Sequence, residues 1–442
     1  MDIKKNRAID KKIIKIAKLA FICTGLFSSI NGFASILHSE SLIQLNDSEL
    51  SDVNGQALMS LSYIAPNDSI NNMQGQGVGF YKLGLEAELD LNANIKKLQL
   101  GCGGVNGAGG CDIDIDNLSL SGIADTREGR VGSSAKLTNP FIEFAIKNPN
   151  SASTREVVGL RLSAEKVLGL LTTGIENSDL PNGINSLSGY MKIKDATGTA
   201  YTGARNGVNY GNLGLTVTGR AKSTTGFITA NFTSNDYALN MGEGSGKLYI
   251  KGQTISGNRM TSVNLSGTAV IDNIALGGRI NATARLWGFV PIPLSGTING
   301  NISNLNVDVN VNQSLGLIHK LQLDNPFSLS LQSQSVWWPN AEISAQKGWW
   351  MAFEDVIDIG DISPSQRVNV TDSVIKQVIP YVSNYLQANP MECGIFALTC
   401  LTGNFNLGNV PLKDAKVNMD LANLKLANQN FAPNCYGNLK FC

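Results

Sequence analysis

An alternation of apolar and polar residues through residues 83–95 most constrains how this chain can fold. Apolar side chains occupy every second position, and most residues between them are charged or carry amides. A period of two predicts a long β-strand with one buried face. A glycine-rich turn bracketed by Cys102 and Cys111 follows, and the alternation resumes over residues 113–120 with a one-residue change of face at Asn117. The sequence therefore predicts a strand, a clipped turn and a returning strand.

The same pattern returns over residues 305–311 and 327–331. One apolar face per strand is typical of antiparallel sheets packed on one side. Only 16% of the 442 residues are charged, and 46 are glycine, which is typical of turn-rich β proteins. We expect an all-β fold of long, mostly antiparallel strands in a large sandwich-like or open-sheet architecture, with a β-solenoid as the alternative. Few short helices are expected, over residues 164–172 and 373–386.

The N-terminus has the features of a secretory signal peptide. Seven Lys or Arg precede a short apolar stretch at Leu19–Phe27, and small residues follow at Gly32 and Ala34. Cleavage after Ala34 is predicted, and no second stretch of ~20 apolar residues follows, so no transmembrane span is expected after signal removal. Residues 35–442 keep 28 of the 35 basic and 33 of the 35 acidic side chains, and this mild acidity gives no reason to expect nucleic-acid binding.

Six cysteines remain after signal removal, and they lie as three near neighbours. Fifteen pairings are possible, but this clustering favours three local disulfide clips and hence an oxidising compartment. The spacings do not match a zinc knuckle, and the chain has only two histidines, His38 and His319. The expected pairs are Cys102 with Cys111, Cys393 with Cys400, and Cys435 with Cys442.

Weak internal similarity suggests a duplication. The sequences at residues 117–120, 137–141 and 162–166 recur in the same order roughly 185 residues later, at 304–307, 323–327 and 343–347. The alternative is chance similarity in a chain rich in Asn and Leu. The expected organisation is a signal peptide (1–34), a short N-terminal segment (35–60), a first β-rich half (61–255), a second β-rich half (256–390) and a cysteine-clipped C-terminal segment (391–442).

The segment after the predicted signal peptide carries a short motif. Its residues are Leu45, Asp47, Glu49, Leu50, Ser51, Val53, Gly55 and Gln56. This motif resembles the start of exported Gram-negative pilus-system proteins of the FilA type. The resemblance implies an envelope or surface protein associated with a fimbrial system, and it implies no active site.

Two clusters could carry binding chemistry. Four of the five tryptophans, Trp337, Trp338, Trp349 and Trp350, fall within fourteen residues. Such a cluster can stack on sugar rings or anchor a protein partner, and it can equally close one end of a β core. Asp112, Asp114 and Asp116 alternate along one strand, which could suggest calcium, but Asn117 and Ile123 replace the glycine and glutamate of a calcium loop. Solvent-facing strand residues are the alternative.

Catalytic motifs are missing from the sequence. It contains no G-x-S-x-G, no H-E-x-x-H and no phosphate-binding glycine loop, so we expect neither an enzyme nor a cofactor. The predicted function is a non-enzymatic cell-surface or pilus-associated structural or adhesion protein, with pilus or envelope proteins, or a host or glycan surface, as partners. The alternative is a periplasmic or outer-membrane-associated binding protein for a lipid or another apolar ligand.

Overall fold

The computed structural model describes residues 59–175, 180–360, 362, 364–393, 403–412 and 416–436. All of these residues belong to one compact unit. The predicted signal peptide and the FilA-like motif lie outside the described residues. Strands make up 58% of the structure and helices 8%, which confirms the all-β prediction.

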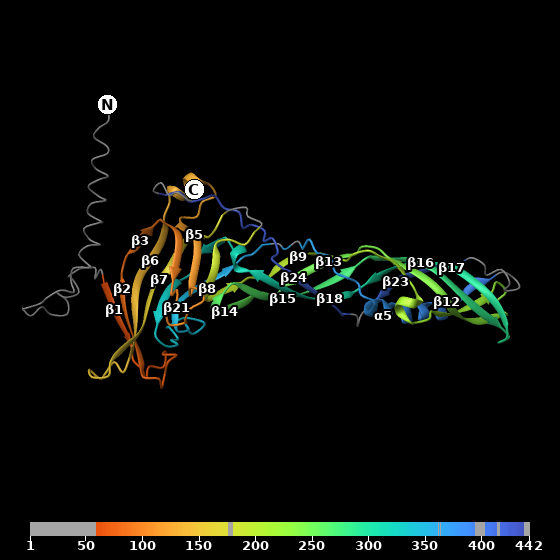
Figure 1. The fold of residues 1–442 in the computed structure, drawn as a ribbon, viewed down its shortest axis with the longest axis horizontal. Helices are drawn as coiled ribbons and strands as arrows, with labels where there is room; N and C mark the ends of the chain where they lie inside the picture. The colour runs from red at the N-terminus through yellow and green to blue at the C-terminus, as the bar shows by residue number, and fades with distance from the viewer. Residues whose placement is uncertain are drawn as a thin grey trace, which may run out of the picture. The chain divides into compact units, whose positions relative to one another are not determined.

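The first sheet has twelve strands, in the order β1-β2-β6-β7-β20-β21-β8-β5-β4, with β3 paired to β6, β14 to β8 and β19 to β7 (Figure 1). Its strands come from the beginning and from the middle of the chain. They are β1 (Met59–Ile64), β2 (Val78–Leu85), β3 (Glu88–Leu91), β4 (Ala93–Leu100), β5 (Ile113–Ser121), β6 (Ala135–Lys147), β7 (Glu156–Thr172), β8 (Ile184–Ile193), β14 (Gln253–Met260), β19 (Lys320–Leu323), β20 (Phe327–Gln332) and β21 (Gly348–Ile357).

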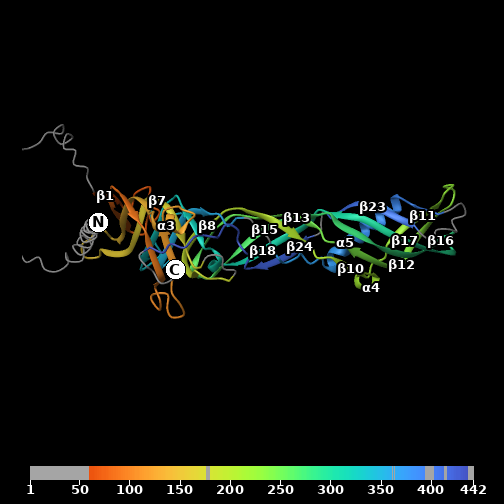
Figure 2. The same cartoon turned by 90° about the horizontal axis from the view of Figure 1, so that it is seen from above.

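The second sheet has five strands in the order β24-β18-β15-β13-β9. Isolated bridges join Ile362 to Gly198 of β9 and to Leu426 beyond β24, so the two edges of this sheet meet through one buried residue. The sheet lies between the other two in both views (Figures 1 and 2). Its strands are β9 (Ala196–Tyr201), β13 (Ser245–Ile250), β15 (Ser262–Asp272), β18 (Leu305–Ser314) and β24 (Lys416–Ala422).

The third sheet has seven strands in the order β22-β11-β12-β16-β17-β23, with β10 on β12, and α5 packs against β11. Its strands are β10 (Arg205–Val208), β11 (Thr218–Ser223), β12 (Thr229–Met241), β16 (Ile274–Leu286), β17 (Val290–Ser303), β22 (Met391–Cys393) and β23 (Gly403–Pro411). The helices are α3 (Arg127–Val131), α4 (Tyr210–Leu213), α5 (Asp372–Ala388) and the 3-10 turn η1 (Leu315–Leu317).

Single asparagines carry the chain from the second sheet to the third and back again. Asn273 separates β15 from β16 and Asn304 separates β17 from β18, each with a φ of 57°. Asparagine tolerates this left-handed backbone better than most residues, and one such residue turns the following side chains to the other face. Asn117 inside β5 has a φ of 49°, which agrees with the change of face predicted there.

The buried side chains form one large cluster through all three sheets and one smaller cluster in the first sheet. The alternation over residues 305–311 is confirmed, because Leu305, Val307, Val309 and Val311 of β18 are all buried. Near the C-terminus the chain returns to the first sheet. There the buried Arg130 of α3 donates a hydrogen bond to the carbonyl oxygen of Ala432 at 2.8 Å.

Most strand pairings are antiparallel, as predicted. Four pairs are parallel, β8 with β21, β11 with β22, β17 with β23 and β18 with β24, and the hairpins between the others do not form the coils of a β-solenoid. The helix predicted over residues 373–386 is confirmed as α5, which contains Pro380 and begins after Thr371. The helix predicted over residues 164–172 is wrong, because those residues lie in β7, where pairing with β6 and β5 outweighs local helix propensity.

The predicted division into two halves does not match the sheets. Its boundary after residue 255 falls inside β14, and the first sheet takes strands from both halves. Residues 162–166 lie in β7, whereas their presumed repeat, 343–347, lies in a loop. The C-terminal segment is not separate either, since β22 and β23 join the third sheet and β24 the second. The presumed repeats share a local feature: Asn117 and Asn304 both have a left-handed backbone conformation.

Candidate functional site

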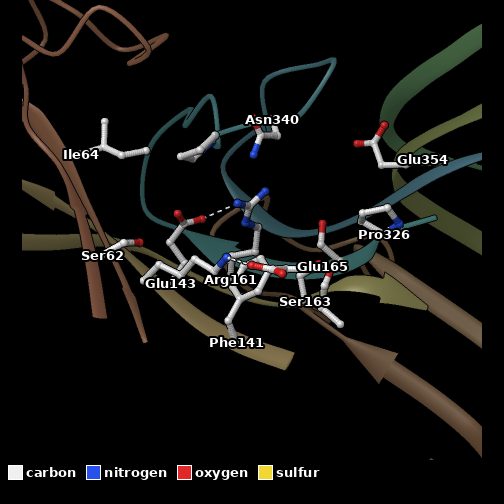
Figure 3. A pocket seen from close by; sticks show the side chains of 14 residues that line it. Ser62, Ile64, Phe141, Glu143, Arg161, Ser163, Glu165, Pro326, Asn340 and Glu354 are labelled. Carbon is white, nitrogen blue, oxygen red and sulfur yellow. Dashed lines mark hydrogen bonds and ion pairs between the residues drawn. The ribbon is translucent and has the colours of Figure 1, made fainter. Parts of the chain in front are cut away.

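A pocket of about 390 Å³ opens on the first sheet, beneath the loop that carries Pro339 and Asn340 (Figure 3). Strands β1, β2, β6, β7, β20 and β21 supply its walls. Its lining is mainly polar. The lining residues are Ser62, Ile64, Lys82, Phe141, Glu143, Arg161, Ser163, Ala164, Glu165, Pro326, Ser328, Pro339, Asn340 and Glu354.

An ion pair between Glu143 and Arg161 forms the floor of the pocket. Glu143 of β6 lies directly opposite Arg161 of β7 in the antiparallel register, so both side chains leave the same face of the sheet. The Nη2 group of Arg161 donates a hydrogen bond to Oε2 of Glu143. The two side chains are only 10% and 3% exposed, respectively. Burial raises the pKa of Glu143 and lowers that of Arg161, and their mutual attraction opposes both shifts.

Most of the hydrogen-bonding capacity of Arg161 is unused. A guanidinium carries five N–H donors. Among the described residues, only Glu143 accepts a hydrogen bond from it, and the buried Nε has no partner. The guanidinium carbon lies 5.5 Å from the ring centre of Phe141 and 5.2 Å from that of Trp338. Figure 3 shows the guanidinium extending into the pocket toward Asn340.

The other charged groups of the pocket are paired. Lys82 contacts Glu165 at 2.8 Å and lies 4.4 Å from the centre of the Phe141 ring. Glu354 accepts a hydrogen bond from the Tyr190 hydroxyl and lies 3.1 Å from the amine of Lys192. Burial raises the pKa of Glu354. Each carboxylate therefore has a cationic partner, and the pocket presents acceptors and donors side by side without a large net charge.

The remaining histidine of the described part lies apart from this pocket. His319 is buried, its Nδ1 lies 3.0 Å from the carbonyl oxygen of Thr173, and burial lowers its pKa. It does not line the pocket with the three carboxylates. Of the serines in the pocket, Ser163 donates its hydroxyl to the carbonyl oxygen of Phe327.

The tryptophan cluster is mostly core. Trp338 and Trp350 are each 2% exposed and belong to the smaller buried cluster, so the interpretation of these two as surface contacts is incorrect. Trp349 is partly buried against the large cluster. Trp337 is 40% exposed, and its indole N–H donates to the carbonyl oxygen of Ala341. Only Trp337 retains substantial exposure.

The three aspartates do not form a calcium site. Asp112 is fully buried and accepts hydrogen bonds from Arg259, Asn106 and the Trp349 backbone. Lys97 lies 2.5 Å from a carboxylate oxygen of Asp114 and 2.9 Å from one of Asp116. Basic and amide groups thus occupy these oxygens. Within the described ranges no three ligating side chains gather in a metal-binding group.

One predicted disulfide is confirmed. Cys102 and Cys111 are bonded and clip the turn between β4 and β5. Cys435 is also disulfide-bonded, whereas its predicted partner Cys442 lies outside the described residues. The Cys400 residue and the side chain of Cys393 lie outside them too, so that pair stays a prediction.

Sequence reasoning missed the Arg161–Glu143 pair. A signal was present, because each is a charged residue in a run of apolar ones, Phe-Ile-Glu-Phe for β6 and Leu-Arg-Leu for β7. The pairing itself depends on the register between the two strands, which the sequence did not supply.

Fold and site together define an all-β protein with a polar binding pocket. No family model, curated protein or solved structure matches the chain. None of the helices in the described part is long and apolar enough to span a membrane.

Proposed function

We propose that this chain is an exported, non-enzymatic surface or pilus-associated adhesion protein, and that its pocket binds a neutral polyhydroxylated ligand of the saccharide class. One observation carries the proposal: a guanidinium nine-tenths buried in a pocket, with one donor used. The buried Nε is out of a ligand's reach, but the Nη groups extend into the pocket, where a ligand oxygen can accept hydrogen bonds from them (Figure 3).

The chemistry of the lining supports a polar ligand over an apolar one. Five charged side chains and three serines face the pocket. A lipid tail would exclude water from these polar groups without offering them hydrogen bonds, which is unfavourable. The alternative function, a carrier of lipid or another apolar ligand, therefore has less support from this pocket.

The balance of charge supports a neutral ligand over an anion. Arg161 and Lys82 are compensated by Glu143 and Glu165, and Glu354 is paired with Lys192, which does not line the pocket. An anion would approach three carboxylates with no uncompensated cation to hold it. A sugar hydroxyl both donates and accepts, so it can bond to Arg161 and to a carboxylate at the same time. A pocket of about 390 Å³ also has the size of a small-ligand site.

Export and surface location have independent support. Disulfides persist in oxidising compartments, and Cys102 is bonded to Cys111. The N-terminal sequence has the features of a signal peptide, and the motif after it resembles FilA-type pilus-system proteins. Protease treatment of intact cells should therefore degrade the protein, and protection equal to that of a periplasmic marker would contradict a surface role.

Ligand binding can be tested by saturation-transfer NMR with glucose, galactose and N-acetylglucosamine. At least one sugar should give a signal with the wild type, and Arg161→Lys should weaken binding at least tenfold because it removes the planar donor group. Arg155→Lys is the matched control, because it makes the same exchange at an exposed residue directly before β7. Asn340→Gly removes a pocket side chain, and the φ of 61° there suits glycine. If no sugar binds, or if both pocket variants bind like the control, the proposal fails.

A further inference from the structure

Two turns at one end of the third sheet expose large aromatic side chains. Phe227 lies in the turn between β11 and β12, and Trp287 and Phe289 flank Gly288 in the turn between β16 and β17. Their exposed fractions are 92%, 73% and 71%. Exposure this high at three aromatics costs solubility unless a partner covers them.

The two turns are neighbours. Phe232 of β12 pairs with Ala284 of β16, so the start of β12 lies beside the end of β16. Phe227 is five residues before one partner, and Trp287 is three residues after the other. In both views β12 and β16 run together to the end of the third sheet that is farthest from the first sheet (Figures 1 and 2). We call these three aromatics the aromatic tip.

The charges around the aromatic tip are mainly basic. Across residues 218–231, 282–294, 391–393 and 403–410, the charged side chains are Arg220, Lys222, Arg285 and Glu392. Glu392 is paired with Lys222 at 2.9 Å. The described part of this end therefore carries two net positive charges beside exposed aromatic rings.

We propose that the aromatic tip inserts into the interface of a lipid bilayer that contains anionic lipids. Tryptophan and phenylalanine beside basic side chains suit the headgroup region, where rings are buried and cations meet lipid phosphates. Trp287 and Gly288 have φ values of 50° and 84°, so the chain reverses sharply there, and the rings are exposed to solvent. A soft lipid interface covers exposed rings without a matching cavity, whereas a protein partner must supply a pocket for each ring.

This inference is independent of the saccharide proposal, because none of its residues lines the pocket. Co-sedimentation with vesicles of phosphatidylcholine and phosphatidylglycerol in a 3:1 ratio tests it directly. The wild type should sediment with these vesicles and bind pure phosphatidylcholine several-fold more weakly. The triple variant Phe227→Ser, Trp287→Ser and Phe289→Ser should lose at least tenfold in partitioning.

Trp337→Phe is the matched control, since it changes an exposed aromatic in the loop between β20 and β21, away from the tip, and should leave partitioning unchanged. In that background, Trp287 fluorescence should shift to the blue on vesicles and be quenched by lipids brominated near the headgroup. The triple variant should keep the wild-type melting temperature, because its exposed rings make few contacts within the protein. Absence of vesicle binding, or equal binding by the triple variant, overturns the inference whatever the result with sugars.

Discussion

The pocket of the first sheet and the aromatic tip of the third sheet use aromatic side chains in opposite ways. Beside the pocket, Trp338 and Trp350 are buried, and Trp338 packs over the guanidinium of Arg161. At the tip, Trp287 is isolated in the sequence and largely exposed. Three of the four clustered tryptophans are buried or partly buried, whereas Trp287, which stands alone in a turn, is the most exposed tryptophan in the described part of the chain.

Ion pairs differ between the two regions in the same way. Arg161 and Glu143 are buried, so each depends on the other for compensation of its charge. The side chains of Lys222 and Glu392 at the tip are 36% and 64% exposed, so water is also a partner. The buried ion pair therefore forms the floor of the pocket, whereas the pair at the aromatic tip mainly affects the surface charge.

The largest effect should come from removing a buried tryptophan. Trp338→Ala should lower the free energy of unfolding by about 4–5 kcal/mol, because it leaves a cavity in the smaller core cluster. Trp287→Ala should change it by less than about 0.5 kcal/mol. Urea unfolding of both variants measures the difference. Similar losses in the two would break the distinction between a packed and an exposed region.

The buried ion pair should give the next largest effect. Glu143→Gln should cost about 3 kcal/mol, because the charge of Arg161 then lacks compensation. Glu392→Gln at the tip should cost less than about 0.5 kcal/mol. Replacing both members, Glu143→Leu with Arg161→Met, should recover much of the loss. A double variant no more stable than Glu143→Gln would show that the pair does more than compensate charge.

The disulfide should have a smaller effect. Replacing Cys102 and Cys111 together with alanine should cost about 2–3 kcal/mol, the chain-entropy estimate for a loop that spans nine residues. The loop packs beside Asp112, which also holds Arg259 and the Trp349 backbone, so the loss should be seen in the first sheet. Hydrogen exchange should therefore accelerate there and stay unchanged at the aromatic tip. Uniform acceleration would mean that the two regions unfold together.

The smallest effect is one of pH. Burial raises the pKa of Glu354 above its value of about 4.3 in an unfolded chain, so wild-type stability should fall as the pH rises through the folded-state pKa. Hydrogen bonds from Lys194 and Gly360 lower the pKa of Asp358, just beyond the same strand, so its contribution is present above about pH 4 and lost at lower pH.

Urea midpoints between pH 3 and pH 8 separate these two groups. The stability of Glu354→Gln relative to the wild type should increase as the pH rises. Asp358→Asn should be less stable than the wild type by most at neutral pH and by little at pH 3. Parallel curves for the two variants would contradict the assignment of Glu354 to a buried, polar pocket.

The local pattern of the sequence predicted the strands and the change of face. At residues 305–311, for example, the apolar residues of the alternation are the buried ones. The local pattern failed where pairing with another strand decides which structure a segment adopts. Residues 164–172 have helix-forming side chains, but β6 holds them in a strand. Arg161 and Glu143 meet only because of strand register, and the sequence does not show which turn tips lie together. The Trp-Gly-Phe turn between two alternating strands was the available signal for the aromatic tip.

The closure of the second sheet has a consequence for biogenesis. Its strand β24 pairs with β18, which lies about 110 residues earlier in the chain. The hydrogen bond from Arg130 to Ala432 joins residues that are 302 positions apart. A chain emerging N-terminus first cannot complete this sheet until nearly all of it has been delivered, and such distant pairings form slowly. Until then the edge of β18 stays open to other strands. A fragment that ends before residue 416, whether from stalled translation or from proteolysis, should therefore be prone to aggregation.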